Sequence, residues 1–256
     1  MVLEPIPSAL GHSADTHRWA REVLLRAWQR WYPGDKPSLE ELQALQALAA
    51  HDGQYGRGWP NKPNPLTGYP TSMQFCNNWG AIQCKCKPQD GVCCDGCGYW
   101  YDSTPTPQGQ RYFEQCFRCY ATPEDGALDL IEFLAKGYRK VVEALPSGDL
   151  DEIAWQMRLG NYFHGFTTDK REAAHQYALA MDKQATAIAE ALGEPKVVYL
   201  GGSGPVAGLS WPELGLIAAA SAFGLAMLAP EALLIPLAAI GDAARYAGTK
   251  ARKVIG

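Results

Sequence analysis

The sequence lacks several features that would assign it to a familiar class of protein. It has no block of like charges: 23 Lys and Arg stand against 27 Asp and Glu, for a net charge of −4. Proteins that bind nucleic acid through its phosphates normally carry a basic face, so nucleic acid is not an expected partner. The sequence also has no internal repeat, which excludes a solenoid.

The N-terminal stretch lacks the marks of a secretory signal peptide. Residues 1–11 show neither the basic start nor the apolar core and small-residue cleavage site of such peptides. If the protein works outside a cytoplasm, we therefore expect another route of delivery.

What is present is distributed unevenly along the 256 residues. Helical patterning covers residues 1–75 and 121–193, all eight cysteines lie within residues 76–120, and residues 211–241 are nearly free of charge. Residues 194–210 contain several Gly and Pro without a helical period, which predicts a linker. The chain is long enough for one large domain with an appendage.

Two helices are predicted near the N-terminus. Apolar residues recur at helical spacing from His17 to Trp31, until a Pro-Gly pair ends the pattern. Ser38 opens a capping box for a second helix, whose leucines recur along one face until Gly53. Asp52 is therefore expected at the C-terminal end of a buried helix.

Three more helices are predicted after the cysteines. Thr122 followed by Pro and two acids is a helix start, and the pattern continues to about Leu145. A short helix is expected from Asp149 to Leu159, and a long one from residue 168 or 169 to Leu192.

Three motifs occur in a suggestive order: AAHDGQYGRGW at 49–59, CNNWGAIQC at 76–84 and CFRCYATPEDGALDLIEFL at 116–134. They resemble the lysozyme-like glucosaminidases and related muramidases that cut peptidoglycan. In that family a buried helix ends in a catalytic acid within a pattern like ExGxG. A strand or turn with a pattern like NNxxGI/V follows, and an FRxYxxxxDGxxDxxxFL segment then opens a later helix. Residues 148–193 resemble the family's closing helices, so the resemblance spans roughly residues 16–193.

The resemblance implies a fold and a domain organisation. We expect a mainly α chain with a lysozyme-like α+β domain over residues 1–193, whose cysteine-rich lobe covers residues 76–120. The linker at 194–210 then leads to an apolar helical tail at 211–256.

The resemblance also assigns site residues: Asp52 as the catalytic acid, and Tyr55, Asn78, Trp79 and Tyr162 as glycan-binding residues. Glycosidic cleavage needs a carboxylic acid that stays protonated near neutral pH, commonly in an apolar pocket. Where the family carries glutamate this chain has aspartate, one methylene shorter, and misplacing a catalytic group by ~1 Å costs on the order of a hundredfold in rate. An active hydrolase is the favoured interpretation, with a slow enzyme or a binding-only relative as alternatives.

The residues alone leave other roles open. Asp52 could be a helix-end carboxylate that pairs with Arg57 or caps a turn, and His51 could be a proton relay or an ordinary surface or hydrogen-bonded histidine. Asp102 and Glu114 are candidates for a second carboxylate that activates water, whereas a lytic-transglycosylase route needs only one acid.

The cysteines permit two structural interpretations. Cys94, Cys97, Cys116 and Cys119 form two C-x2-C pairs with the spacing of a structural zinc site. The even number of eight within a short, aliphatic-poor lobe equally predicts up to four disulfides. No catalytic cofactor is expected under either interpretation.

The apolar tail is a candidate membrane segment. From Leu214 to Ile240 only Glu231 is charged, and at 1.5 Å per residue such a helix exceeds the ~30 Å hydrocarbon core of a bilayer. A buried helical hairpin or a plug against partner proteins are the alternatives.

These features together predict a glycosidase of bacterial peptidoglycan, acting as a bacteriophage particle component or lysin that opens the wall. The expected location is a phage virion or the bacterial cell envelope, and the expected partners are peptidoglycan, other phage particle proteins and a membrane through residues 211–241. The alternative is a non-catalytic structural or wall-binding component of a phage tail or injection machine.

Overall fold

The computed structural model describes residues 13–57, 64, 66–68, 76–106, 109–163 and 167–201. The chain divides into two units, residues 1–208 and 209–256. The second unit, and with it the predicted apolar tail, lies outside the described residues. Within the described part, no helix combines the length and the apolar character needed to cross a bilayer.

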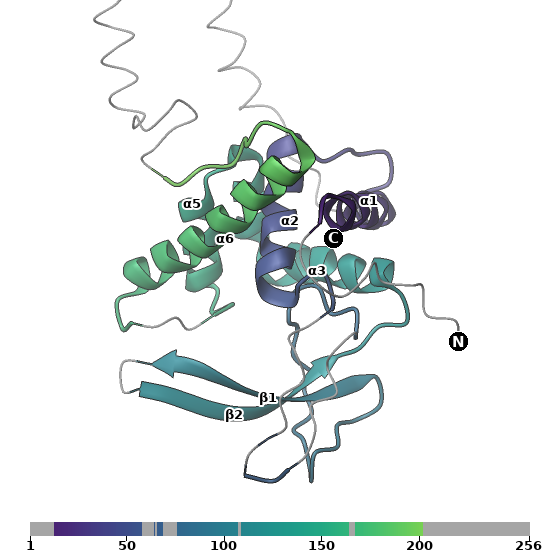
Figure 1. Ribbon diagram of the computed structural model, residues 1–256, viewed down its shortest axis with the longest axis vertical. Coiled ribbons are helices and arrows are strands. Elements are labelled where there is room, and N and C mark those ends of the chain that lie inside the picture. The colour runs from purple at the N-terminus through teal and green to yellow at the C-terminus, as the bar shows by residue number, and fades with distance from the viewer. Residues whose placement is uncertain are drawn as a thin grey trace, which may run out of the picture. The chain divides into compact units, whose positions relative to one another are not determined.

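The described part is mainly helical, with one small sheet, as expected (Figure 1). The helices are α1 (Ala14–Trp31), α2 (Leu39–Gly53), α3 (Pro123–Gly137), α4 (Arg139–Ala144), α5 (Leu150–Leu159) and α6 (Lys170–Leu192). A single 3-10 turn, Leu145–Ser147, separates α4 from α5. Helix α2 packs against α1 and α6 and is buried on nearly all sides, so it forms the centre of the core.

Side-chain caps fix where most helices begin. In α2 the Ser38 hydroxyl accepts from the Glu41 amide while the Glu41 carboxylate accepts from the Ser38 amide at 2.7 Å, so the predicted capping box is confirmed. Thr122, Asp149 and Asp169 are the N-caps of α3, α5 and α6: the Thr122 side chain accepts from one backbone amide of the first turn, and the two aspartates accept from two each. The predicted helices therefore begin within a few residues of their expected positions.

The helix predicted from Thr122 to about Leu145 is interrupted, which corrects that prediction. Tyr138 leaves the helical region with φ −134° and ψ 50°, and α4 begins after it. Its ring packs against those of Phe133, at 5.1 Å, and Tyr162, at 5.3 Å between centroids. Gly137, a weak helix former, is the last residue of α3 before this break.

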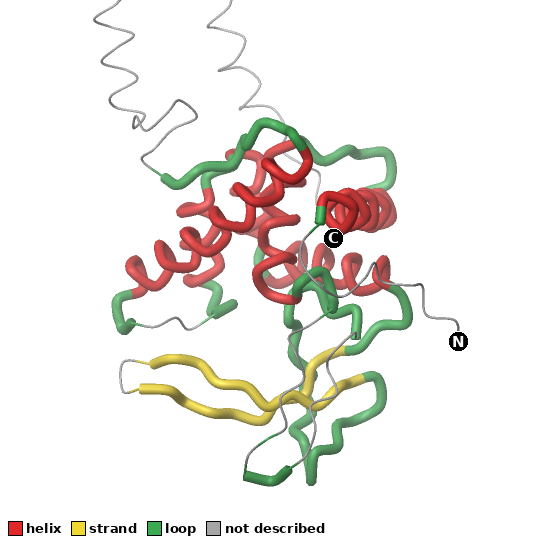
Figure 2. The backbone as a smooth tube through the Cα atoms, in the orientation of Figure 1, coloured by secondary structure: helices red, strands yellow, loops and turns green. Residues whose placement is uncertain are grey.

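The cysteine-rich lobe is built on one antiparallel hairpin. Strand β1 (Cys97–Thr106) pairs with β2 (Gly109–Arg118), with Cys97 opposite Arg118 at its base. The helices gather on one side and the hairpin, with the lobe's loops, lies on the other (Figure 2). Among its described residues, a small cluster around Trp100 and Phe117 gives this lobe an apolar core.

Two polar links join the hairpin to the helices. The guanidinium of Arg118, at the end of β2, donates to both carboxylate oxygens of Asp129 in α3, each at 2.8 Å. The hydroxyl of Tyr120 donates to the same carboxylate. This part of β2 is therefore fixed to the helical core.

The first residues of the predicted linker pack on the helical core. The Gln43 side chain in α2 donates to the carbonyl of Pro195 and accepts from the amide of Val197, both at 2.9 Å. Val198 is buried, and Tyr199 forms a backbone bridge with Asp149. Residues 194–201 thus belong to the folded unit.

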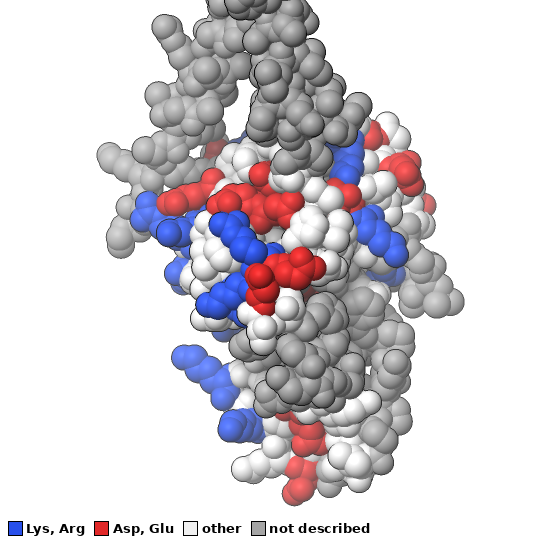
Figure 3. All heavy atoms as spheres, turned by 90° about the vertical axis from the view of Figure 1, so that its left-hand side faces the viewer, with Lys and Arg blue, Asp and Glu red and all other residues white. Residues whose placement is uncertain are grey.

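Acidic and basic side chains are interspersed over the face of the helices that Figure 3 shows. Ion pairs at least partly open to solvent, such as Arg30 with Glu124 and Arg139 with Glu143, also occur among the described residues. Pairs of this kind contribute little to stability because water and salt screen them.

Candidate functional site

Three segments converge on the carboxyl group of Asp52. Asp52 lies in the last turn of α2, Tyr162 follows α5, and Tyr177 is in α6. The hydroxyl of Tyr177 lies 2.5 Å from Asp52 Oδ1, and the hydroxyl of Tyr162 lies 2.7 Å from Oδ2. Each carboxyl oxygen therefore has its own phenol partner.

Aromatic contacts hold both phenols in place. Phe163 stacks on Tyr177 with centroids 4.1 Å apart and the planes within 6°, while the His51 ring meets Tyr177 edge-on at 4.8 Å. The Tyr162 ring packs against Tyr138 and Phe133. Neither tyrosine can turn without breaking ring contacts, so the carboxyl group of Asp52 is held between fixed partners.

The surroundings favour the protonated form of Asp52. Burial raises the pKa of its carboxyl, and the opposing effects of nearby His51 and of the Tyr177 and Tyr162 hydroxyls do not cancel that rise. The carbonyl end of α2 carries partial negative charge, which acts in the same direction as burial. Burial and the charge of Asp52 hold the pKa values of Tyr162 and Tyr177 well above that of ordinary tyrosine, so both remain neutral.

The hydrogen-bond geometry at Tyr162 accommodates a proton on Asp52. Its hydroxyl lies 2.7 Å from Asp52 Oδ2 and 3.0 Å from the carbonyl oxygen of Gly80, but it has only one hydrogen to donate. When Asp52 is protonated, Oδ2 donates to Tyr162, which in turn donates to Gly80. Both contacts are then satisfied at once, whereas an ionised Asp52 and Gly80 compete for the same hydrogen.

Three of the residues expected to bind glycan are buried. Tyr55 and Trp79 are 0% exposed and Asn78 is 1% exposed. The hydroxyl of Tyr55 lies 2.8 Å from Nδ1 of His17, and its ring packs against that of Trp79 with centroids 5.6 Å apart. Asn78 donates to the carbonyls of Ile82 and Arg118 and accepts from the amide of Ile82. These contacts hold the three side chains inside the fold.

Tyr162 is the predicted site residue that contacts Asp52, and Tyr177 is the contact that the sequence analysis missed. Tyr177 lies within residues 148–193, which resemble the family's closing helices, but no motif in that stretch marks this tyrosine. The Nε of Arg57 donates to the carbonyl of Gln54 at 3.2 Å, whereas the described hydrogen-bond partners of Asp52 are the two phenols. The interpretation of Asp52 as an ion pair with Arg57 is therefore wrong.

Of the two candidates for a second carboxylate, Glu114 has a described side chain and Asp102 does not. Glu114 lies on β2, where its Oε1 accepts from the hydroxyl of Tyr99 at 2.8 Å and from the amide of Asn64 at 2.5 Å. These bonds fix the orientation of Glu114. Asp102 is on β1, and its side chain lies outside the described residues.

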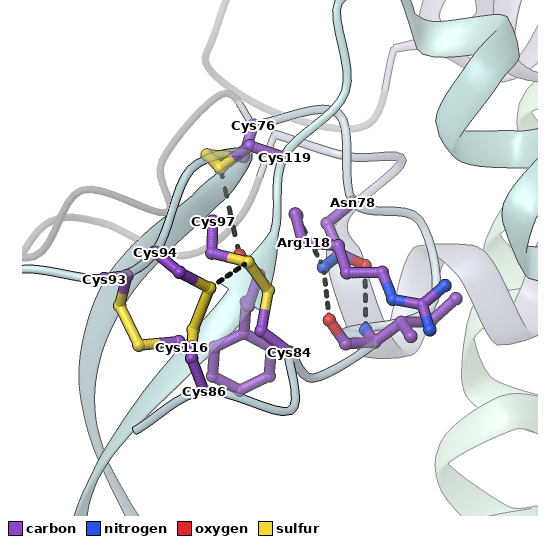
Figure 4. Close-up of a disulfide and its surroundings, with 12 residues drawn as sticks. Cys76, Asn78, Cys84, Cys86, Cys93, Cys94, Cys97, Cys116, Arg118 and Cys119 are labelled. Carbon is purple, nitrogen blue, oxygen red and sulfur yellow. Dashed lines mark hydrogen bonds between the residues drawn. A yellow bond between two sulfur atoms is a disulfide. The ribbon is translucent and has the colours of Figure 1, made fainter. Parts of the chain in front are cut away.

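The cysteines form four disulfides, and no free thiol is found in the described chain: Cys76–Cys119, Cys84–Cys97, Cys86–Cys94 and Cys93–Cys116 (Figure 4). The disulfide interpretation is the one the structure adopts. The zinc quartet expected from spacing is not assembled, because its four members pair with four different partners. The close approach of the loops, which spacing does not encode, selects these pairs.

A separate hollow of about 350 Å³ lies between α5 and the start of α6. Its lining includes Trp155, over whose ring the Arg171 guanidinium lies 3.6 Å from the centroid, and His175, which contacts Asp151 at 2.8 Å. Neither Asp52 nor its two phenols line it. The chemistry of the Asp52 cluster is thus independent of this hollow.

No family model and no curated protein matches the sequence. The structure is similar to the catalytic domain of the autolysin Auto from Listeria monocytogenes, with 11% identity and a TM-score of 0.41 over 72% of this chain and 89% of that one. It is also similar to a peptidoglycan hydrolase mutant from Sphingomonas sp. A1, with 14% identity and a TM-score of 0.41 over 71% and 94%. At these values the likeness assigns neither an activity nor a residue role to this chain.

Proposed function

We propose that the protein is a glycosidase that cleaves the glycan strand of bacterial peptidoglycan, with Asp52 as its general acid. The observation that carries the proposal is the Asp52 carboxyl, whose pKa burial raises and whose two oxygens are each held by a tyrosine hydroxyl. The substrate class is supported by the sequence motifs at 49–59, 76–84 and 116–134 and their resemblance to peptidoglycan-cutting enzymes.

The proposed step uses Asp52 in its protonated form. The carboxyl donates its proton to the oxygen of the scissile glycosidic bond as that bond breaks and positive charge develops on the sugar ring. Tyr162 and Tyr177 orient the carboxyl and then stabilise the carboxylate by donating to it. A raised pKa keeps the acid form available closer to neutral pH, which is what this role requires.

Two routes complete the reaction. Water activated by a second carboxylate, for which Glu114 is the described candidate, gives hydrolysis. Attack by a hydroxyl of the sugar itself releases an anhydro sugar and is the lytic-transglycosylase route. Mass spectrometry of the released fragments distinguishes the two, because the anhydro product is lighter by one water.

The test is digestion of purified murein by wild-type protein and by Asp52→Asn, with release of soluble glycan as the readout. We expect Asp52→Asn to lose a factor of about 100 or more in rate, the usual contribution of a general acid. Asp52→Glu should retain or raise activity because it restores the reach found in the family. Asp15→Asn, at an exposed position in α1, is the matched control and should behave like wild type. Unchanged murein clearing by Asp52→Asn would refute the assignment.

The alternative function is wall binding without cleavage, favoured by the aspartate that stands where the family carries glutamate. A binding protein would sediment with murein and release no fragments, and Asp52→Glu would not create activity. Cosedimentation measured alongside digestion separates the two functions.

We further propose that the enzyme opens the wall as part of a phage particle or as a phage lysin, with residues 211–241 inserting into a membrane. The nearly uncharged run followed by Arg245, Lys250, Arg252 and Lys253 supports this setting, because such basic flanks are typical of membrane segments. The full chain should then float with liposomes. A chain ending at Gly201, which keeps the packed residues 194–201, should remain soluble and cut murein.

A further inference from the structure

Four sulfur atoms from two neighbouring disulfides form one cluster. The Sγ atoms of Cys84, Cys86, Cys94 and Cys97 all lie within 4.8 Å of one another, and those of Cys94 and Cys97 are 3.5 Å apart (Figure 4). The other two disulfides, Cys76–Cys119 and Cys93–Cys116, contribute no atom to it.

The dimensions of this cluster fit a tetrahedral metal centre. Four thiolates bound to zinc at about 2.3 Å lie about 3.8 Å from one another. The unbonded sulfurs of the cluster are already near that separation, while the two bonded pairs must open from about 2 Å once they are reduced. Cys94 and Cys97 sit on one tight turn, in which the amide of Cys97 donates to the carbonyl of Cys94 at 3.0 Å. Gly96 allows that turn, because its φ of +76° suits glycine. Cys84 and Cys86 supply the opposite edge from a second loop.

Access to the cluster is open. Cys94 is exposed and the other three cysteines are partly exposed, so a reductant and a metal ion can both reach the sulfurs. Both disulfides, Cys84–Cys97 and Cys86–Cys94, connect the same two loops, at residues 84–86 and 94–97. A metal ion held by all four would join those loops in place of the two disulfides.

We propose that Cys84, Cys86, Cys94 and Cys97 form a redox-dependent zinc site, which exists as two disulfides when oxidised and binds one Zn²⁺ when reduced. This quartet differs from the one expected from spacing: it keeps Cys94 and Cys97 but takes Cys84 and Cys86 in place of Cys116 and Cys119. The inference does not depend on the glycosidase, since none of these sulfurs contacts Asp52 among the described contacts.

The conversion balances with a dithiol as the reductant. Each of the two disulfides accepts two electrons and two protons from one dithiol, which closes to its own cyclic disulfide. The four resulting thiols then lose their protons to solvent as their sulfurs bind the metal ion. The base of β2 stays attached to the 84–86 loop in both states, because the amide of Cys84 donates to the carbonyl of Cys116 at 2.7 Å.

The first experiment titrates the full chain with Co²⁺ after graded reduction with a dithiol. Tetrahedral cobalt bound by thiolates gives intense visible and near-ultraviolet absorption, and we expect saturation at one ion per chain. The double variant Cys84→Ser, Cys86→Ser should lose this signal. The double variant Cys76→Ser, Cys119→Ser removes another disulfide of the same lobe and should keep it, which makes it the matched control.

The second experiment needs no variant and therefore does not depend on how well a variant folds. Reduced wild-type protein is alkylated with and without Zn²⁺, and the labelled cysteines are mapped by mass spectrometry. We expect Zn²⁺ to protect residues 84, 86, 94 and 97 at least tenfold relative to the other four cysteines. Equal labelling of all eight in the presence of Zn²⁺, or a cobalt signal that survives in Cys84→Ser, Cys86→Ser, would overturn the proposal.

Discussion

The hydroxyl of Tyr177 donates to Oδ1 of Asp52 over 2.5 Å, although 125 residues separate the two in the sequence. This contact joins the end of α2 to α6 through the carboxyl group that we propose as the catalytic acid. Burial raises the pKa of Asp52, whereas the charge of His51 and the hydrogen bonds from Tyr177 and Tyr162 oppose that rise. Tyr177 therefore contributes to the pH range in which the acid can donate its proton.

Removing the Tyr177 hydroxyl should move the pH profile of murein cleavage. In Tyr177→Phe the carboxylate loses a donor, so the pKa of Asp52 rises further and the decline in activity on the alkaline side shifts to higher pH. The measurement is kcat/KM against pH, with Tyr199→Phe as a control in residues 194–201. An alkaline limb that stays in place or moves to lower pH would contradict the role assigned to Tyr177.

The stability of the fold should also report the raised pKa of Asp52. The folded protein binds this proton more tightly than the unfolded chain, so the free energy of unfolding falls as pH rises from about the ordinary value of 3.8 to the raised one. Asp52→Asn removes the ionisable group. At neutral pH it should be more stable than wild type by about 1.4 kcal/mol for each pH unit by which folding raises that pKa.

Denaturant unfolding at several pH values checks this expectation. The stability advantage of Asp52→Asn should shrink toward zero below the ordinary aspartate pKa, because the Asp52 carboxyl of the wild type is then protonated in both the folded and the unfolded protein. Asp15→Asn, at an exposed position, should show no comparable gain. An advantage that persists unchanged in acid would mean that the substitution acts through packing.

Local signals in the sequence predicted the helix starts well because each depends on a few adjacent residues. Ser38, Thr122, Asp149 and Asp169 cap their helices where expected. The break at Tyr138 was not predicted, because the contact of its ring with Tyr162, which follows α5, joins segments that are distant in the sequence and leaves no local signal.

The site was predictable only in part, because some of its contacts join segments that are distant in the sequence. Asp52 follows from a helix end and a motif, both local. Tyr177 reaches Asp52 because α6 packs on α2, and no spacing rule contains that packing. Cysteine spacing likewise left zinc and disulfides open, since the choice depends on which loops approach each other.

Asn78 should matter for stability more than for contact with substrate. Its buried side chain makes three hydrogen bonds, to the backbone of Ile82 twice and of Arg118 once. Asn78→Ala leaves buried backbone groups without these partners, and each such group costs about 1–3 kcal/mol. We expect the free energy of unfolding to fall by at least about 2 kcal/mol, with the exposed Gln176→Ala as the control. A loss of murein binding at full stability would instead place Asn78 in contact with the glycan.

The turn at residues 77–80 links packing to the site, which a pair of glycine variants in α3 can test. A Cβ at Gly126 would lie 1.7 Å from the carbonyl oxygen of Asn77, so the turn or the helix must move. A Cβ at Gly137, in the same helix, would meet nothing within 4 Å. Gly126→Ala should therefore cost about 1–3 kcal/mol or more through overpacking, whereas Gly137→Ala should be neutral or stabilise by up to about 1 kcal/mol.

The same pair should differ in activity. Displacing the turn moves the carbonyl of Gly80, which lies 3.0 Å from the Tyr162 hydroxyl, and so disturbs the orientation of Asp52. A shift of ~1 Å at a catalytic group costs on the order of a hundredfold in rate. We expect Gly126→Ala to lose most murein cleavage at a temperature where circular dichroism shows it folded, and Gly137→Ala to keep it. Full activity in a folded but destabilised Gly126→Ala would show that the turn supports the fold without positioning the acid.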